Sequence, residues 1–163
     1  MTQSEQRSLE SLVEEVSGEF VPPLTTRSST TQAVLASASG NTSSSYFHEL
    51  LTQHCLLLIE CGQLQGFLSF QTFHRDTRLP QIGICIYVSI ISVRPAARGR
   101  GLARLLYQNL LRLPETLPAW ILLRTRSTNT HHLHLLDTLG FKRLLTVPND
   151  RDRVDSIYLG CKR

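Results

Sequence analysis

A short turn rich in glycine and arginine, residues 94–101, lies between two apolar segments of different character. The segment before it, residues 82–93, is rich in β-branched residues and is typical of a buried strand. The segment after it, residues 102–113, has leucines at helical spacing. A strand therefore passes through a tight turn directly into a helix. Such a turn points several backbone N–H groups into one concavity, where the helix dipole favours an anion and Arg98 and Arg100 can pair with phosphate oxygens.

The spacing of the glycines narrows the choice of phosphate ligand. A mononucleotide P-loop needs a lysine after its second glycine, and no lysine follows Gly101. A dinucleotide fold needs a third glycine where this chain has Arg104. The pattern Arg98-x-x-Gly101-x-Ala103 instead resembles the acetyl-CoA signature of the GNAT superfamily of N-acetyltransferases, which reads Gln/Arg-x-x-Gly-x-Gly/Ala.

A second element of that superfamily follows in the expected order. Residues 119–123 predict a strand, Asn129 follows it, and the next helix ends at Gly140 and Phe141. Asparagine suits the start of a helix, and glycine suits a left-handed residue at its end, so the local chemistry supports both boundaries. The resemblance covers about residues 56–163.

The resemblance implies an α+β fold of the acyl-CoA N-acyltransferase type. Its mixed, centrally splayed β-sheet of about six or seven strands is flanked by helices. The rest of the pattern agrees: hairpins are predicted at 56–70 and at 141–159, the latter turning at 148–150, and residues 74–81 read as a loop. The length of 163 residues predicts a single domain, residues 1–163.

The amino-terminal part, residues 1–45, departs from that fold. The family usually opens with a strand, whereas residues 4–17 here predict an amphipathic helix. The only strand candidate nearby, residues 19–21, is cut short by Pro22. The Ser/Thr-rich stretch that follows, residues 27–32, is expected to line the acceptor pocket, with Arg27 offering a cation to an acidic group on the substrate. A mobile surface loop is the alternative interpretation.

The resemblance also implies which residues bind acetyl-CoA as the acyl donor. The turn would hold the pyrophosphate, the strand edge before it would pair with the pantetheine arm, and the asparagine would contact the pantetheine region. The expected cofactor-binding residues are Ile91, Val93, Arg98, Gly99, Arg100, Gly101, Leu102, Ala103 and Asn129. For Asn129, a plain helix cap is the alternative interpretation.

The acid–base residues of the family are replaced in this chain. Many members carry a tyrosine seven residues after the asparagine, where this chain has Leu136. Histone-type members carry a glutamate at the position of Tyr87. The catalytic residue therefore stays unassigned. Tyr87 is a candidate, together with Ser89 for the acceptor pocket, and packing within a strand is the alternative role for both.

Charge and composition leave two further hypotheses open. The net charge of +4 and the Arg-Gly-Arg-Gly run favour a basic RNA-binding module, although this run is enclosed between a strand and a helix. The missing acid–base residues favour a non-catalytic acetyl-CoA-binding or regulatory domain. The leading hypothesis is an N-acetyltransferase whose acceptor is a small-molecule or peptide amine, and a homodimer is a further candidate assembly.

Other compositional features predict absences. The four cysteines lack zinc spacing, and His131, His132 and His134 lack the His-Glu-x-x-His pattern, so no metal is expected. No apolar run reaches the length of about 20 residues that a membrane helix needs. The first residues do not resemble a signal peptide, so we expect a cytoplasmic protein without a membrane segment.

Overall fold

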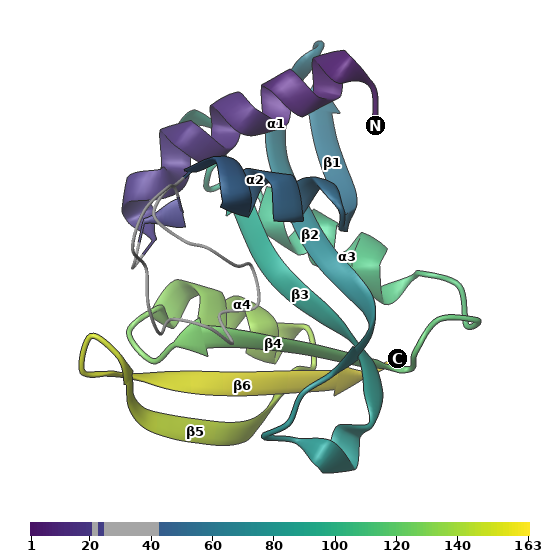
Figure 1. Ribbon diagram of the computed structural model, residues 1–163, viewed down its shortest axis with the longest axis vertical. Helices are drawn as coiled ribbons and strands as arrows, with labels where there is room; N and C mark the ends of the chain where they lie inside the picture. The colour runs from purple at the N-terminus through teal and green to yellow at the C-terminus, as the bar shows by residue number, and fades with distance from the viewer. Residues whose placement is uncertain (21–22, 25–42) are drawn as a thin grey trace. The chain divides into compact units, whose positions relative to one another are not determined.

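The computed structural model describes residues 1–20, 23–24 and 43–163 (Figure 1). The residues expected to line the acceptor pocket near Arg27 lie outside these ranges. The helices are α1 (Gln3–Val16), η1 (Ser17–Glu19), α2 (Ser43–Leu51), η3 (Pro80–Ile82), η4 (Pro95–Ala97), α3 (Leu102–Leu111) and α4 (Thr130–Thr138). The strands are β1 (His54–Glu60), β2 (Gln63–Arg75), β3 (Ile84–Val93), β4 (Trp120–Arg126), β5 (Lys142–Arg151) and β6 (Val154–Lys162).

The strands of the described chain form one mixed sheet. Their order in the 6-stranded sheet is β1-β2-β3-β4-β6-β5. β3 pairs with β4 in parallel, with Cys85–Val88 beside Trp120–Leu123. β4 pairs with β6, and β6 with β5, in antiparallel registers. The mixed α+β fold class is therefore confirmed, while the central splay of the sheet stays a prediction.

The chain divides into two compact units, and β2, β3 and α3 contribute residues to both. The first unit consists of residues 1–69 and 89–106, and the second of residues 70–88 and 107–163. The expected single domain over residues 1–163 stays a prediction. In the ranges that the structure describes, no helix is long and apolar enough to cross a membrane.

In the first unit, α1 is an amphipathic helix with a capped start. The Thr2 side chain accepts a hydrogen bond from the Glu5 amide, and the Glu5 carboxylate accepts one from the Thr2 amide. Apolar residues at helical spacing on α1 are fully buried with residues of α2, β2 and β3. The helix expected over residues 4–17 is confirmed. The strand candidate that Pro22 cuts short does not form in its described residues 19–20, because Ser17–Glu19 continue the helix as a 3₁₀ turn.

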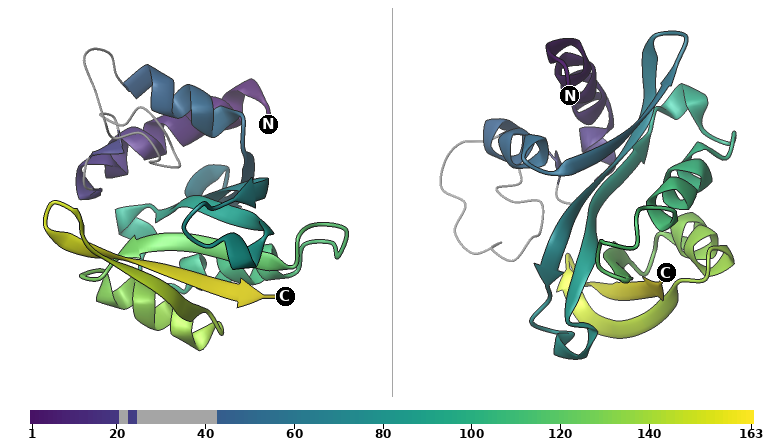
Figure 2. Two further views of the ribbon diagram at one scale, coloured as in Figure 1. Left: turned by 60° about the horizontal axis from the view of Figure 1, so that its bottom comes forward. Right: turned by 90° about the vertical axis from the view of Figure 1, so that its right-hand side faces the viewer.

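In the second unit, side chains alternate between the two faces of β4. α4 covers one face of this strand (Figure 2). Thr125 lies on that face, because its hydroxyl oxygen is 3.4 Å from His132 Nδ1. Leu122 and Arg124 therefore lie on the opposite face. That face carries an apolar cluster formed by Leu79, Cys85, Tyr87, Leu122 and Tyr158.

Two expectations about loops were wrong. β2 continues to Arg75, so His74 lies in a strand and not in the expected loop 74–81. β5 continues to Arg151, so the hairpin turns at Asp152 and Arg153 instead of at 148–150. Both turn residues have positive φ angles (46° and 61°), as the common two-residue hairpin turn requires. The Pro-Asn pair that suggested a turn lies instead within a register shift of β5, between Val147 and Arg151.

Candidate functional site

The turn between β3 and α3 has the backbone geometry of an anion site. After η4, the chain passes through residues 98–101 and enters α3 at Leu102. Gly99 and Gly101 both have a φ of 77°, a left-handed conformation that residues with a side chain adopt only at a cost. A Cβ atom added at either glycine would meet nothing within 4 Å. Both positions therefore face open space that a ligand can occupy.

The turn also presents a row of free donors. Within the described part of the chain, the backbone N–H groups of residues 99–103 have no hydrogen-bond acceptor. The first amides of a helix lack an intrahelical partner, and here they continue a run that begins in the turn. Consecutive free amides at the start of a helix favour a phosphate. The geometry fits the pyrophosphate group expected at these residues.

The arginines of the turn are paired within the chain. Arg98 donates from Nε to the Val93 carbonyl (3.0 Å) and from Nη2 to Glu19 (2.6 Å). Arg100 pairs with Glu60 through Nη1 and Oε2 at 2.9 Å. The sequence did not suggest these carboxylates. The four side chains are 35–54% exposed, where ion pairs contribute little and a phosphate can compete for the guanidinium groups.

The end of β3 is held close to β2 by Gly66. A Cβ atom at this position would lie 2.9 Å from the Ser92 carbonyl oxygen, so only glycine allows the approach. The Arg94 amide then donates to the Gln65 carbonyl at 2.7 Å. In the last part of β3, just before Arg94, the side chains of Ile91 and Val93 are half-buried. The buried hydroxyl of Ser89 has no partner in the described ranges, which leaves it available to a ligand.

In the second unit, Tyr87 has a neighbour that the sequence did not suggest. The ring of His74 lies 4.6 Å from the ring of buried Tyr87. Cys85, two residues before the tyrosine, donates from Sγ to the His74 carbonyl at 3.5 Å. Burial lowers the pKa of His74, and Asp76, whose Oδ2 is 4.0 Å from Nε2, opposes that shift in part. The imidazole is therefore neutral at neutral pH and can accept a proton.

The residues of α4 have mainly structural roles. The Asn129 side chain accepts from the His132 amide at 3.4 Å, so it caps the helix as the alternative interpretation expected. Its contact with pantetheine stays a prediction. Leu136, at the position of the family tyrosine, is fully buried, and its carbonyl accepts from the Phe141 amide. A larger side chain at this fully buried position would overpack the core.

A buried polar chain connects α3, α4 and β4 within the second unit. The Tyr107 hydroxyl lies 2.8 Å from His132 Nε2, and His132 Nδ1 lies 3.4 Å from the Thr125 hydroxyl. Burial raises the pKa of Tyr107, which keeps its hydroxyl protonated and makes it the donor to Nε2. Burial lowers the pKa of His132 to about 4, so the imidazole is neutral. Its remaining proton then lies on Nδ1 and faces Thr125.

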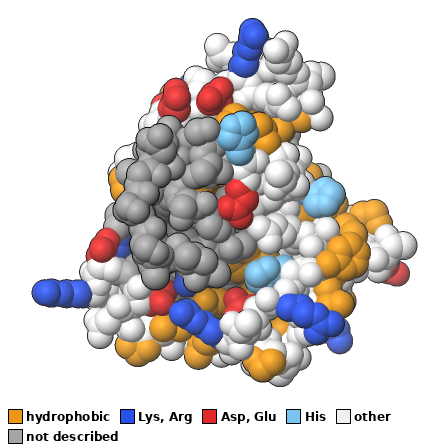
Figure 3. All heavy atoms as spheres, viewed as in Figure 1, with side chains coloured by type: hydrophobic (Ala, Val, Ile, Leu, Met, Phe, Trp, Pro, Cys, Tyr) orange, Lys and Arg blue, Asp and Glu red, His pale blue; other side chains and the backbone are white. Residues whose placement is uncertain are grey.

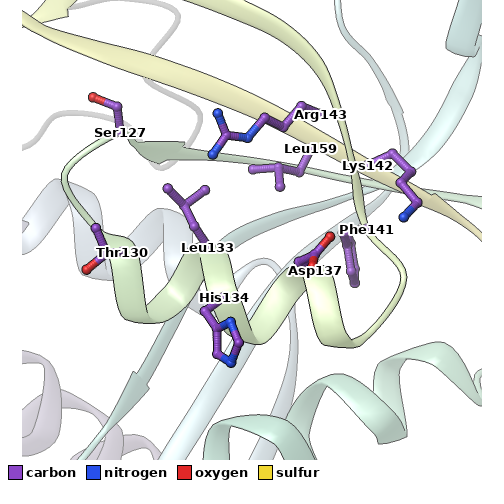
Figure 4. Close-up of a pocket in the computed structure, with 9 residues that line it drawn as sticks. All are labelled: Ser127, Thr130, Leu133, His134, Asp137, Phe141, Lys142, Arg143 and Leu159. Atoms are coloured by element: carbon purple, nitrogen blue, oxygen red, sulfur yellow. The ribbon is translucent and has the colours of Figure 1, made fainter.

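A cavity of about 490 Å³ lies between α4 and the β5–β6 hairpin (Figure 4). Leu133, Phe141 and Leu159 form its apolar part. Charged and polar side chains also line it: Ser127, Thr130, His134, Asp137, Lys142 and Arg143. None of the residues expected to bind acetyl-CoA lies among them. The cavity therefore gives no support to a cofactor role.

The described residues show no metal centre. No three His, Cys, Asp or Glu side chains in these ranges come together as ligands. His131 and His134 are exposed on α4. All four cysteines are free thiols, and burial raises the pKa of Cys85 to about 11. That thiol is protonated at neutral pH and is therefore a poor nucleophile.

Comparison with known proteins identifies the family. The profile of the acetyltransferase (GNAT) family matches residues 13–141, which is most of the chain. The chain belongs to the GNAT acetyltransferase family. This membership confirms the expected enzyme class, an N-acetyltransferase. No curated protein matches the chain in a sequence search.

Solved structures of GNAT enzymes share the fold. An N-acetyltransferase from Staphylococcus aureus Mu50 is 16% identical, with a TM-score of 0.74 over 99% of this chain and 94% of that one. A ribosomal-protein-alanine N-acetyltransferase from Brucella melitensis is 14% identical, with a TM-score of 0.73 over 100% and 97%. YncA from Salmonella typhimurium, solved with its cofactor acetyl-CoA, is 16% identical, with a TM-score of 0.69 over 99% and 90%.

Proposed function

We propose that this GNAT protein transfers the acetyl group of acetyl-CoA to an amine, and that the turn before α3 binds the pyrophosphate of the donor. The free N–H groups of residues 99–103 carry this proposal. They line one stretch of backbone at the start of a helix, and the glycines leave the space beside it open. When bound, acetyl-CoA supplies an activated acyl group as a thioester.

The segment before the turn is suited to hold the rest of the donor. Ile91 and Val93 offer backbone groups with which a pantetheine arm can pair in the manner of an added strand. The Ser89 hydroxyl, buried without a partner in the described ranges, can donate to a polar atom of that arm. Arg98 and Arg100 supply positive charge at the pyrophosphate when its oxygens replace the glutamates as partners of the two guanidinium groups.

The candidate proton acceptor of the reaction is His74, a residue of the second unit. An acceptor amine must lose a proton when its nitrogen attacks the thioester carbon, and a neutral imidazole is a suitable proton acceptor. His74 meets this requirement, because burial keeps it neutral and the Tyr87 ring packs against it. Tyr87 can then relay a proton or position the amine. The C–S bond breaks as CoA departs as a thiolate, which needs little acid assistance because thiols have a pKa of about 8.5 and the thiolate can take its proton from water.

The competing hypotheses make different predictions. A non-catalytic acetyl-CoA-binding domain would bind the donor without releasing its thiol in the presence of amines. An RNA-binding module would bind RNA and would not bind acetyl-CoA. Membership of the acetyltransferase family favours the acetyltransferase. The cytoplasmic location and the homodimer stay predictions.

The experiment is to measure thiol release from acetyl-CoA with a panel of amines. We expect release that depends on the amine and falls at least tenfold in His74→Gln, since positioned acid–base groups contribute about 10²–10⁴-fold. His134→Gln, which removes an exposed histidine from α4, is the matched control and should retain wild-type rates. Binding of acetyl-CoA without release for any amine would favour the non-catalytic domain.

A further inference from the structure

A cluster of charged side chains lies within the second unit on the sheet face that carries Tyr87. Arg124 of β4 donates from Nη1 to Asp150 Oδ2 at 3.1 Å, and Arg78 donates from Nη1 to Asp150 Oδ1 at 3.3 Å. Both guanidinium groups also donate to the Tyr158 hydroxyl, at 3.4 and 3.1 Å, and lie within 6 Å of its ring centroid. Figure 3 shows basic, acidic and histidine side chains at the surface over β6.

The cluster is built into the hairpin. The register shift of β5 between Val147 and Arg151 inserts extra residues and aims Asp150 at the arginines. Asn149 has a φ of 51°, and its backbone N–H donates to Asp155 Oδ1 at 3.0 Å, which fixes this conformation. Arg124 and Asp150 are only 6% and 12% exposed. Burial alone would raise the pKa of Asp150, but Ser156, Arg124 and Arg78 together lower it.

The cluster is continuous with the candidate proton-transfer residues. Tyr87 pairs in register with Leu122 of β4, and Arg124 follows Leu122 on the same face. Tyr87, Leu122 and Tyr158 also belong to one buried apolar cluster. An amine bound beside Tyr87 would therefore lie near Arg124, which is the next side chain after Leu122 on this face of β4.

Arg126 extends the row of arginines on this sheet face. Arg78 and Arg124 both contact the carboxylate of Asp150. Arg126 lies on the same face of β4, opposite buried Ser156 in the register with β6. Its Nε atom is buried and has no hydrogen-bond partner among the described residues. A buried donor without a partner carries a desolvation cost, which a bound acceptor oxygen removes.

We propose that Arg126, beside the Arg78–Arg124–Tyr158 cluster, binds an anionic group of the acceptor, so that the preferred acceptor is an amine that also carries a carboxylate. A guanidinium group matches a carboxylate geometrically, with two parallel N–H donors for two oxygens. The partial burial of the face strengthens that pairing relative to water. The proposal rests on the proposed function and names the acceptor class of the same site.

The test compares acceptors in matched pairs that differ in one charge. Glycine and glycinamide form one pair, and the C-terminally amidated dipeptides Ala-Asp-amide and Ala-Asn-amide form another, so that only one member of each pair carries a carboxylate. We expect the acidic member to have the higher kcat/KM in at least one pair. Arg126→Gln should lower kcat/KM for that member by about 10- to 100-fold, the range of a charge-assisted hydrogen bond, and leave the neutral member unchanged. Arg126→Lys should restore part of the loss.

The control removes the same charge from the other face. Arg143→Gln alters an exposed arginine of β5 that lines the cavity beside α4. This variant should leave kcat/KM unchanged for both members of each pair. Equal kcat/KM for both members of every pair, or an equal loss for both in Arg126→Gln, would overturn the proposal while acetyl transfer itself stands. Absence of thiol release with every amine would instead refute the proposed function, and this inference with it.

Discussion

Lowering the pH should destabilise the protein through His132, in a way that one substitution isolates. The imidazole is buried between the Tyr107 hydroxyl and Thr125, and its pKa falls from 6.5 to about 4. The folded protein therefore resists protonation at this site, whereas the unfolded chain accepts the proton near pH 6.5. Because the folded pKa is lowered, the stability from this site is complete above pH 6.5 and is lost as the pH falls towards 4.

The size of the effect follows from the pKa shift. One pKa unit corresponds to about 1.4 kcal/mol. Protonation of His132 in the unfolded chain should therefore lower the free energy of unfolding by about 2 kcal/mol when the pH falls from 7 to 5. In His132→Gln the titrating group is gone, and this part of the pH dependence should vanish. The variant will be less stable at pH 7, because it alters the contacts with the Tyr107 hydroxyl, but the gap to the wild type should narrow by about 2 kcal/mol at pH 5.

Urea unfolding at the two pH values provides the measurement. His131→Gln is the matched control, since it removes an exposed imidazole from the neighbouring position of α4. Its unfolding free energy should follow the wild type at both pH values. An equal loss of stability in wild type and His132→Gln between pH 7 and pH 5 would show instead that the imidazole titrates alike in the folded and unfolded chains.

Three further substitutions test other contacts. Tyr107→Phe leaves the Nε2 atom of its histidine partner without a donor and should cost about 1–3 kcal/mol in urea unfolding; an unchanged midpoint would contradict the hydrogen bond. Gly66→Ala forces β2 away from the Ser92 carbonyl and should cost about 1–3 kcal/mol, whereas Gly18→Ala, with open space around it, should cost under about 1 kcal/mol. Asp150→Asn weakens a largely buried ion pair and should cost about 2 kcal/mol; a loss below about 0.5 kcal/mol would show that the pair is structurally neutral.

Local chemistry explains what the sequence predicted well. The turn at Gly99 and Gly101, the Asn129 cap and the helix end at Gly140 each depend on residues within a few positions of one another. The backbone conformation of these residues follows from their own side chains or the lack of one. These features therefore became visible before any tertiary contact was known.

The charged contacts could not be found in the same way. Arg124 and Asp150 are 26 positions apart in the sequence, and Arg78 and Asp150 are 72 positions apart. The pairing depends on the β5 register shift, and Pro148 and Asn149 suggested a turn instead of a bulge. His74 was likewise missed, because its place beside Tyr87 requires β2 to extend further than Gly and Pro signals indicate.

The central claim is that the amides of residues 99–103 bind acetyl-CoA, and one pair of variants tests it. Gly101 and Gly62 have φ values of 77° and 75°, and a Cβ atom meets nothing within 4 Å at either position. Glutamate at either site should therefore cost similar backbone strain, about 1 kcal/mol or more, but only Gly101→Glu places a side chain and a negative charge in the proposed phosphate site.

Calorimetric titration of acetyl-CoA into the three proteins gives the answer directly. We expect wild type and Gly62→Glu to bind with the same affinity and Gly101→Glu to lose at least 100-fold, about 2.8 kcal/mol. Urea unfolding without ligand should show both variants folded and similarly destabilised. Full affinity in a folded Gly101→Glu protein would contradict the account, because the donor would then bind elsewhere in the chain.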